Sequence, residues 1–200
     1  MSRLIDFPLR QYIDKWHLAQ FIETGTFEGA GIKEVIDEGI TNIFSCDVQD
    51  FFIKDPVKFS ESVNVNLYIG RSVDLLPKML KDATDDPALI FLDAHCDPKL
   101  FRGFLKDIDT DDGDPLPLLT EVKVLTENRD ISNDVIIVDD LHLYVKEMAV
   151  QRFDGWKTKL PPIQFKTVKE YKAAINGFFP NHDAKVMRIH DVSLLLTPKG

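Results

Sequence analysis

The chain has 200 residues, of which 44% are hydrophobic and 28% are charged, and this composition is that of a globular protein rather than a disordered one. A chain of this length buries enough apolar surface to fold without disulfides. Its net charge of −9 disfavours nonspecific binding to nucleic acid or to an anionic membrane.

We expect one domain over residues 1–200, with residues 1–17 as an N-terminal extension and residues 145–165 as an insertion. Charges are spread through the N-terminal segment, and no apolar stretch approaches the roughly 20 residues of a membrane span. The two cysteines, Cys46 and Cys96, follow apolar runs without metal-site spacing, so we expect buried free thiols. These features predict a cytoplasmic protein without a membrane partner.

Short apolar runs alternate with segments of helical periodicity along the chain. We expect strands at residues 18–22, 42–46, 63–69, 88–92 and 134–138, and helices at 29–38, 51–60, 72–81, 118–129, 145–153 and 168–178. Continuously apolar strands are typical of a parallel sheet covered by helices, and two final runs, 185–189 and 193–197, indicate a hairpin. The pattern predicts an α/β fold: a doubly wound, mostly parallel, seven-stranded Rossmann-like sheet with helices on both faces and a C-terminal antiparallel hairpin.

Acidic residues follow four of the five apolar strands, and they are Glu23, Asp47, Asp93 and the pair Asp139-Asp140. Ligands of open α/β sheets bind outside the carboxyl ends of the strands, so these acids predict a site at that edge. The alternative is that each acid caps the helix or turn that follows.

A glycine turn, ETGTFEG at residues 23–29, lies between the first expected strand and the first helix. Gly25 would allow the backbone to approach a ligand closely. Asp47 comes 22 positions after Gly25, near the spacing of roughly 20 at which a ribose-binding acid follows such a turn. Alone, a glycine cluster is a weak signal, but its place between strand and helix is the expected context.

These motifs together resemble the S-adenosylmethionine-dependent methyltransferases of the Rossmann-like class I, and most closely a subgroup with ETGT, LDAH and VDD strand ends, here at residues 23–26, 92–95 and 138–140. The resemblance extends over roughly residues 21–143 and implies S-adenosylmethionine as the cofactor. Phe27 and Glu28 stand where the commoner motif alternates glycines. The cofactor contacts that it implies are Glu23, Thr24, Gly25, Thr26, Gly29, Asp47, Ser72 and Asp93.

The acids Asp93, Asp139 and Asp140 could supply three oxygen ligands to Mg²⁺, as in the metal-dependent O-methyltransferases that they resemble. The catalytic candidates are Asp93, His95 and His142, because histidine titrates near neutral pH. The alternatives are solvated or capping acids and surface histidines.

We therefore predict O-methylation of a small-molecule or sugar-like acceptor. Two alternatives stay open: a non-catalytic binding protein with the methyltransferase fold, and a metal-dependent hydrolase or nucleotide-sugar enzyme that uses the Asp93, Asp139 and Asp140 rim. Neither the acceptor nor the oligomeric state follows from the sequence.

Overall fold

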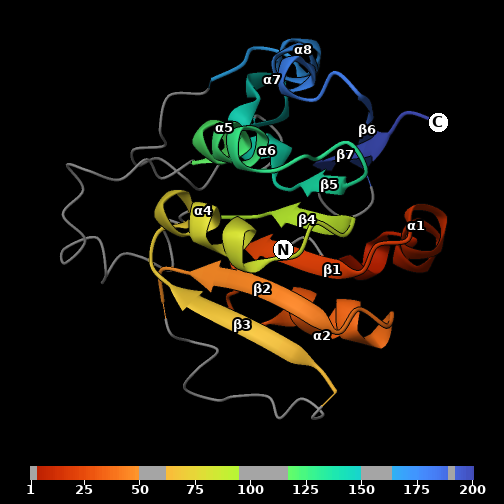
Figure 1. Cartoon of the computed structure of the whole chain (residues 1–200). Helices are drawn as coiled ribbons and strands as arrows, with labels where there is room; N and C mark the ends of the chain where they lie inside the picture. The colour runs from red at the N-terminus through yellow and green to blue at the C-terminus, as the bar shows by residue number, and fades with distance from the viewer. Residues whose placement is uncertain (1–3, 50–61, 95–116, 150–163, 189–191) are drawn as a thin grey trace.

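The computed structural model describes residues 4–49, 62–94, 117–149, 164–188 and 192–200. In this part of the chain, seven strands form one sheet in the order β3-β2-β1-β4-β5-β7-β6 (Figure 1). The first five strands in the chain are parallel to one another, and they are β1 (Gln20–Thr24), β2 (Asn42–Asp47), β3 (Asn64–Ile69), β4 (Ala88–Leu92) and β5 (Val135–Val138). The terminal hairpin, β6 (His182–Arg188) and β7 (Val192–Pro198), joins through β7, which runs antiparallel to β5. The predicted fold class is confirmed.

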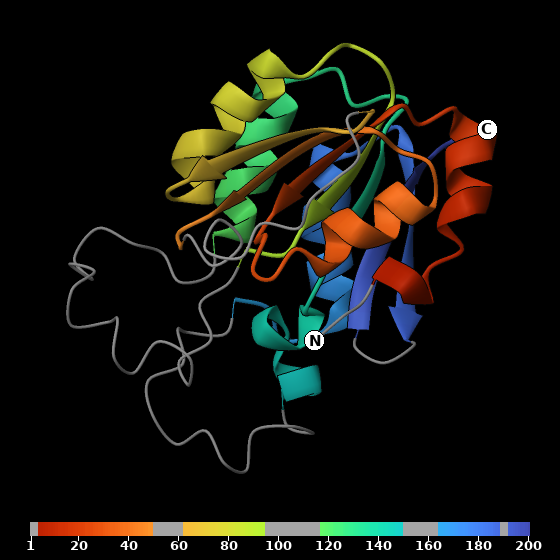
Figure 2. The same ribbon diagram turned by 90° about the horizontal axis from the view of Figure 1, so that it is seen from below.

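Successive strand residues enter two different cores because side chains alternate across a sheet. Phe21 packs on one face and Ile22 on the other, and both are fully buried. The core with Phe21 lies under the helices η1 (Leu4–Asp6), α1 (Leu9–Trp16) and α2 (Ala30–Asp37). The core with Ile22 lies under α4 (Ser72–Asp82), α5 (Leu118–Asn128), α6 (Leu141–Tyr144) and α8 (Val168–Phe178), and α7 (Lys146–Ala149) follows α6. Figure 2 shows α4 and α5 on one side of the sheet and α1 and α2 on the other.

Most elements form where the apolar pattern predicts them, and β4 and α8 have the expected bounds. The first strand is shifted by two residues because Gln20, although polar, is fully buried and donates to the carbonyls of Thr84 and Asp86. The last residue of β1 is therefore Thr24, so Glu23 lies inside the strand rather than after it. The helices η1, α1 and α6 were not expected, and the helix expected at residues 51–60 lies outside the described residues.

None of the helices in the described ranges has both the length and the apolar composition that crossing a membrane requires.

Candidate functional site

The carboxyl ends of β1, β2 and β4 are joined at the point where the strand order reverses. From β1 the chain continues to β2, which pairs with one edge of β1, and it later returns to β4, which pairs with the other edge. The amide of Gly25, after β1, donates to the carbonyl of Cys46 at 2.8 Å, and the amide of Asp93, after β4, donates to the carbonyl of Thr24 at 3.1 Å. Open α/β sheets bind ligands at this reversal, and these strand ends meet there.

The turn after β1 is strained and can be made only with glycine at its first position. Gly25 has φ +92°, and a Cβ there would lie 2.7 Å from the carbonyl oxygen of Asp93. Gly29 has φ +73° at the start of α2, while Phe27 has φ +44°, which is rare for a bulky residue. Backbone strain of this kind persists where the surrounding structure enforces it, and it gathers at ligand sites.

Glu23 is a buried carboxyl group beneath this turn, with 2% exposure. The Ser45 hydroxyl donates to its Oε2 at 2.6 Å and lies 2.6 Å from the Thr26 hydroxyl, so three side chains form one chain of hydrogen bonds. A Cβ at Gly31 would overlap Oε1 of Glu23, so glycine in α2 makes room for the carboxyl. Burial raises the pKa of Glu23 from 4.5 to about 8, against the Ser45 hydrogen bond and with smaller contributions from Asp93, Asp47 and Glu34.

Asp47, the last residue of β2, links the glycine turn to the chain beyond β2. Its Oδ2 accepts from the amide of Phe27 at 2.7 Å, and its Oδ1 accepts from the amide of Gln49 at 2.9 Å. A carboxylate oxygen has a second lone pair, so both oxygens can also accept hydrogen bonds from ligand hydroxyls. The half-buried carboxylate is therefore held in position without being saturated.

Three carboxylates meet at the ends of β4 and β5. One oxygen from each of Asp93, Asp139 and Asp140 lies within 4.8 Å of the others. Ligand oxygens around one Mg²⁺ ion are roughly 3–4 Å apart, given a metal–oxygen length of about 2.1 Å, so small side-chain rotations bring these atoms onto one ion. Asp139 and Asp140 are 2% and 7% exposed, and crowded buried carboxylates favour a cation between them. The donor set therefore fits a hard divalent cation.

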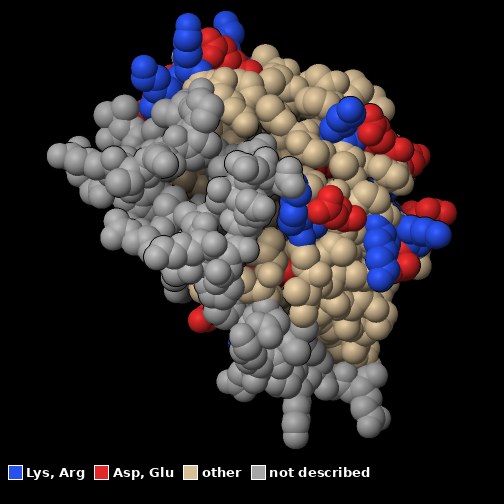
Figure 3. Space-filling view, turned by 90° about the vertical axis from the view of Figure 1, so that its left-hand side faces the viewer, with Lys and Arg blue, Asp and Glu red and all other residues tan. Residues whose placement is uncertain are grey.

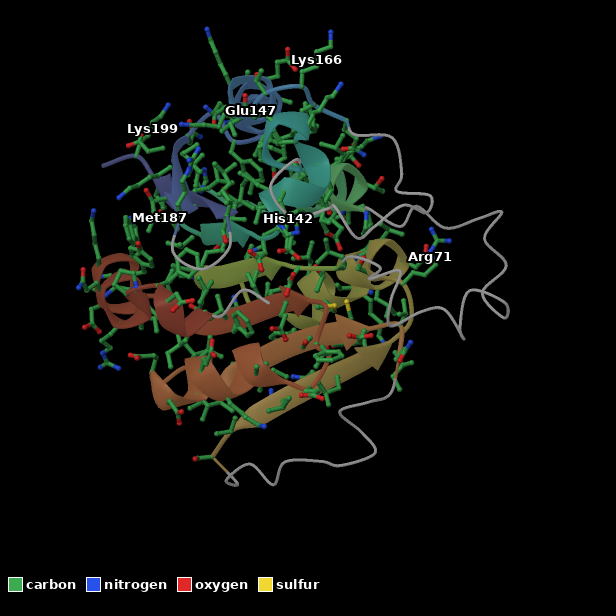
Figure 4. All side chains as sticks on the ribbon, turned by 180° about the vertical axis from the view of Figure 1, so that it is seen from behind. Arg71, His142, Glu147, Lys166, Met187 and Lys199 are labelled. Carbon is green, nitrogen blue, oxygen red and sulfur yellow. The ribbon has the colours of Figure 1, made fainter. Side chains whose placement is uncertain are left out.

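Asp140 also precedes α6, which brings His142 to this group. The backbone of Asp140 has the left-handed helical conformation, with φ +50°. Its Oδ1 is 3.5 Å from Nδ1 of His142, which lies on α6 (Figure 4). Burial, followed by the charges of Glu121, Tyr171, Asp140 and Asp93, raises the pKa of Tyr144 well above 10, so its hydroxyl remains a donor at neutral pH.

The structure brings together most of the residues proposed from the sequence. The glycine turn, Asp47 and Asp93 share the reversal point, and His142 lies beside the carboxylates. Ser72 is buried as the first residue of α4, which follows the turn after β3. His95 lies outside the described residues.

Two serines of the site were not anticipated. Ser45 lies inside β2, where a polar residue in an apolar run was the available signal. Ser193, in β7, donates to Asp139 Oδ1 at 2.7 Å. The residues that follow strands do not include Ser193, because the antiparallel strand β7 presents its first residues at this edge.

No family model and no curated protein matches the sequence. Solved structures match over the whole chain, however. An O-methyltransferase from Bacillus cereus in complex with SAH (S-adenosylhomocysteine) is 14% identical with a TM-score of 0.57, and the match covers 100% of this chain and 82% of that one. An SAH-bound methyltransferase from Podospora anserina is 16% identical with a TM-score of 0.55, covering 100% and 80%.

The MycE methyltransferase of the mycinamycin biosynthetic pathway, in complex with Mg, SAH and mycinamycin VI, is 12% identical with a TM-score of 0.53, and the match covers 94% of this chain and 48% of that one. At these identities the likeness establishes the fold: the chain has the α/β fold of the class I methyltransferases.

Proposed function

We propose that this protein is an S-adenosylmethionine-dependent methyltransferase. The observation that carries the proposal is the junction of Gly25, Asp47 and Asp93 at the reversal of strand order, in a fold whose solved examples include complexes with SAH. The glycine turn would accommodate the methionine part of the cofactor, with Glu23 and Thr26 supporting the turn from below. Thr24 and Gly29 flank this turn.

The two acceptor oxygens of Asp47 would receive the ribose hydroxyls. Ser72, at the start of α4, would lie near the adenine, since the amide of Gly70 donates to the carbonyl of Asp47 at 2.9 Å and ties this turn to β2. Asp93 would flank the reacting end of the cofactor. Alignment of a nucleophile with the methyl group and sulfur supplies much of the rate of methyl transfer.

The acceptor that we propose is a hydroxyl of a small or sugar-like molecule. Such a hydroxyl needs help in losing its proton, and the residues available are Asp93, His142 and, from the sequence alone, His95. Asp93, Asp139 and Asp140 would hold Mg²⁺ or a similar ion, and a bound cation lowers the pKa of a coordinated hydroxyl. On the face toward which β2 points, Figure 3 shows both Lys or Arg and Asp or Glu side chains among the described residues.

The test is calorimetric titration of S-adenosylhomocysteine into the purified protein, with and without Mg²⁺. We expect saturable binding that Asp47→Ala weakens at least about 10-fold, since a hydrogen bond to a charged group is lost. Asp183→Ala is the matched control, because Asp183 is an exposed strand aspartate in β6, at the opposite edge of the sheet from β3. No binding of S-adenosylhomocysteine at millimolar concentration would overturn the proposal.

A metal-dependent hydrolase or nucleotide-sugar enzyme is the second candidate, and the proximity of Asp93, Asp139 and Asp140 favours it. This candidate requires metal-dependent turnover without S-adenosylmethionine. A protein that binds S-adenosylhomocysteine, yet methylates no acceptor in a broad hydroxyl screen, would instead be a non-catalytic relative.

A further inference from the structure

The antiparallel strand β7 brings a hydroxyl to the carboxylate group at the ends of β4 and β5. In the register of this pair Val138 lies opposite Leu194, so the next position places Ser193 beside Asp139. Both side chains are buried, each at 2% exposure. The Ser193 hydroxyl donates to Oδ1 of Asp139 at 2.7 Å. The other residues at this edge of the sheet follow the ends of parallel strands, whereas Ser193 lies near the beginning of the antiparallel strand β7.

Asp139 is therefore fixed at two points. Its amide donates to the carbonyl of Leu92 at 3.1 Å, which ties the end of β5 to the end of β4. Its carboxylate is oriented by Ser193 through a short, charge-assisted hydrogen bond. The same carboxylate contributes one of the three oxygens that lie within 4.8 Å of one another. A hydrogen bond to the carboxylate limits its rotation and leaves lone pairs on both oxygens for another ligand.

We propose that Ser193 is a positioning residue for divalent-cation binding: it holds the Asp139 carboxylate in the orientation that binds a cation together with Asp93 and Asp140. This inference rests on the cation site proposed above and deepens it, because it gives the C-terminal hairpin a part in the site. Residues that hydrogen-bond to metal ligands typically change metal affinity about 10- to 100-fold when they are removed.

A purely structural role for Ser193 makes a different prediction. If the hydroxyl only satisfies a buried carboxylate, its removal destabilises the protein but leaves the affinity for the cation unchanged. Thermal stability in EDTA measures the first effect, and Mn²⁺ binding measures the second. Ser132 provides the matched control, since its hydroxyl also donates to an aspartate, Asp130, at 2.6 Å, and both residues precede β5, away from the carboxyl ends of the strands.

The experiment titrates Mn²⁺ into the metal-free protein and follows free Mn²⁺ by electron paramagnetic resonance. We expect Ser193→Ala to weaken Mn²⁺ binding about 10-fold or more. We expect Ser193→Thr, which keeps the hydroxyl, to stay within about 3-fold of the parent chain, and Ser132→Ala to do the same. S-adenosylhomocysteine binding in EDTA should be the same for Ser193→Ala and the parent chain.

Equal Mn²⁺ affinity in Ser193→Ala and the parent chain would overturn the role of Ser193 and leave the cation site intact. Absence of Mn²⁺ binding by the parent chain would overturn both, while the titration with S-adenosylhomocysteine would still judge the methyltransferase proposal separately. If Ser193→Ala does not fold in EDTA, the Mn²⁺ affinity of Ser193→Cys is compared with that of the parent chain instead, because a thiol is a weaker hydrogen-bond donor than a hydroxyl. A weakened affinity then supports the inference, and an unchanged affinity overturns it.

Discussion

Asp134 and Asp139 flank β5, one before it and one after it, and both are almost fully buried, at 1% and 2% exposure. Asp134 forms two hydrogen bonds with Arg129, Nε to Oδ2 at 2.7 Å and Nη2 to Oδ1 at 3.1 Å. Asp139 instead receives the Ser193 hydroxyl and lies among other carboxylates. We call the amino ends of the parallel strands the amino rim and their carboxyl ends the carboxyl rim. At the amino rim the buried charge of Asp134 is neutralised within the chain, whereas the carboxyl rim brings together like charges that a bound cation would neutralise.

The amino rim is a closed structural network. Arg129 also donates to the carbonyls of Thr84 and Asp86, the same two that Gln20 binds. The His182 ring contributes its Nε2, 3.0 Å from the carbonyl of Asp134, and since a carbonyl only accepts, Nε2 carries the proton. Burial lowers the pKa of His182, which favours this neutral form.

The largest expected effect is the loss of Arg129. Arg129→Ala leaves Asp134 charged and buried, so we expect the free energy of unfolding to fall by about 3–5 kcal/mol. Urea unfolding at neutral pH measures this change. Lys123→Ala is the control, because the Lys123–Glu127 pair of α5 is mostly exposed and should contribute at most about 0.5 kcal/mol. The contrast between the rims breaks if the folded Arg129→Ala protein also binds S-adenosylhomocysteine much more weakly.

Glu23, at the carboxyl rim, should make the stability of the protein depend on pH. Because the pKa of Glu23 is raised from 4.5 to about 8, the folded chain binds more protons than the unfolded chain between these values. The contribution of Glu23 to stability is therefore greatest below pH 4.5 and falls as the pH rises toward 8. Glu23→Gln removes this loss. We therefore expect the free energy of unfolding of Glu23→Gln, relative to that of the parent chain, to rise by about 2–4 kcal/mol from pH 5 to pH 8.5.

Urea unfolding at several pH values compares Glu23→Gln with the parent chain. Glu127→Gln, at an exposed position of α5, should retain the slope of the parent chain. Parallel stability curves for Glu23→Gln and the parent chain would show that Glu23 is ionised in the folded protein at neutral pH.

A smaller effect should follow from filling the space at the strand reversal. A Cβ on Gly25 would meet the carbonyl of Asp93 at 2.7 Å, and its φ of +92° is unfavourable for alanine. We expect Gly25→Ala to lower stability by about 2 kcal/mol and to weaken S-adenosylhomocysteine binding at least about 10-fold. Gly177→Ala in α8 is the matched control, since a Cβ at this position would meet nothing within 4 Å. We expect this substitution to raise the free energy of unfolding by about 0.5–1 kcal/mol. Unchanged binding by Gly25→Ala would place the cofactor elsewhere.

Burial explains which parts of the molecule the sequence predicts well. The strand β4 is apolar throughout and buried on both faces, so its bounds follow from the pattern alone. The strand β1 contains the buried polar residues Gln20, Glu23 and Thr24, whose partners lie far along the chain. Hydrophobicity cannot predict the burial of such residues, because their hydrogen-bond partners are contributed only by the folded sheet.

The residues of the candidate site also fall into those that the sequence predicts and those that only the folded structure reveals. The acids after parallel strands are predictable, because parallel strands all end at one edge of the sheet. The direction of β7 and its register against β5 are tertiary facts, and they alone place Ser193 beside Asp139. The backbone contacts of Asp47 with Phe27 and Gln49 likewise depend on the turn geometry, which the residue types do not specify.

The smallest effect should come from the Tyr171 hydroxyl, which is buried under α8. Among the described residues it has no hydrogen-bond partner, and burial, together with the charge of Asp139, raises its pKa. Tyr171→Phe keeps the edge-to-face contact with Phe165, at 5.3 Å between ring centroids, and removes the unsatisfied group. We therefore expect a gain of about 1 kcal/mol in urea unfolding. A loss of similar size would mean that the hydroxyl has a partner in solution, such as a buried water, and that the surroundings of Asp139 extend to α8.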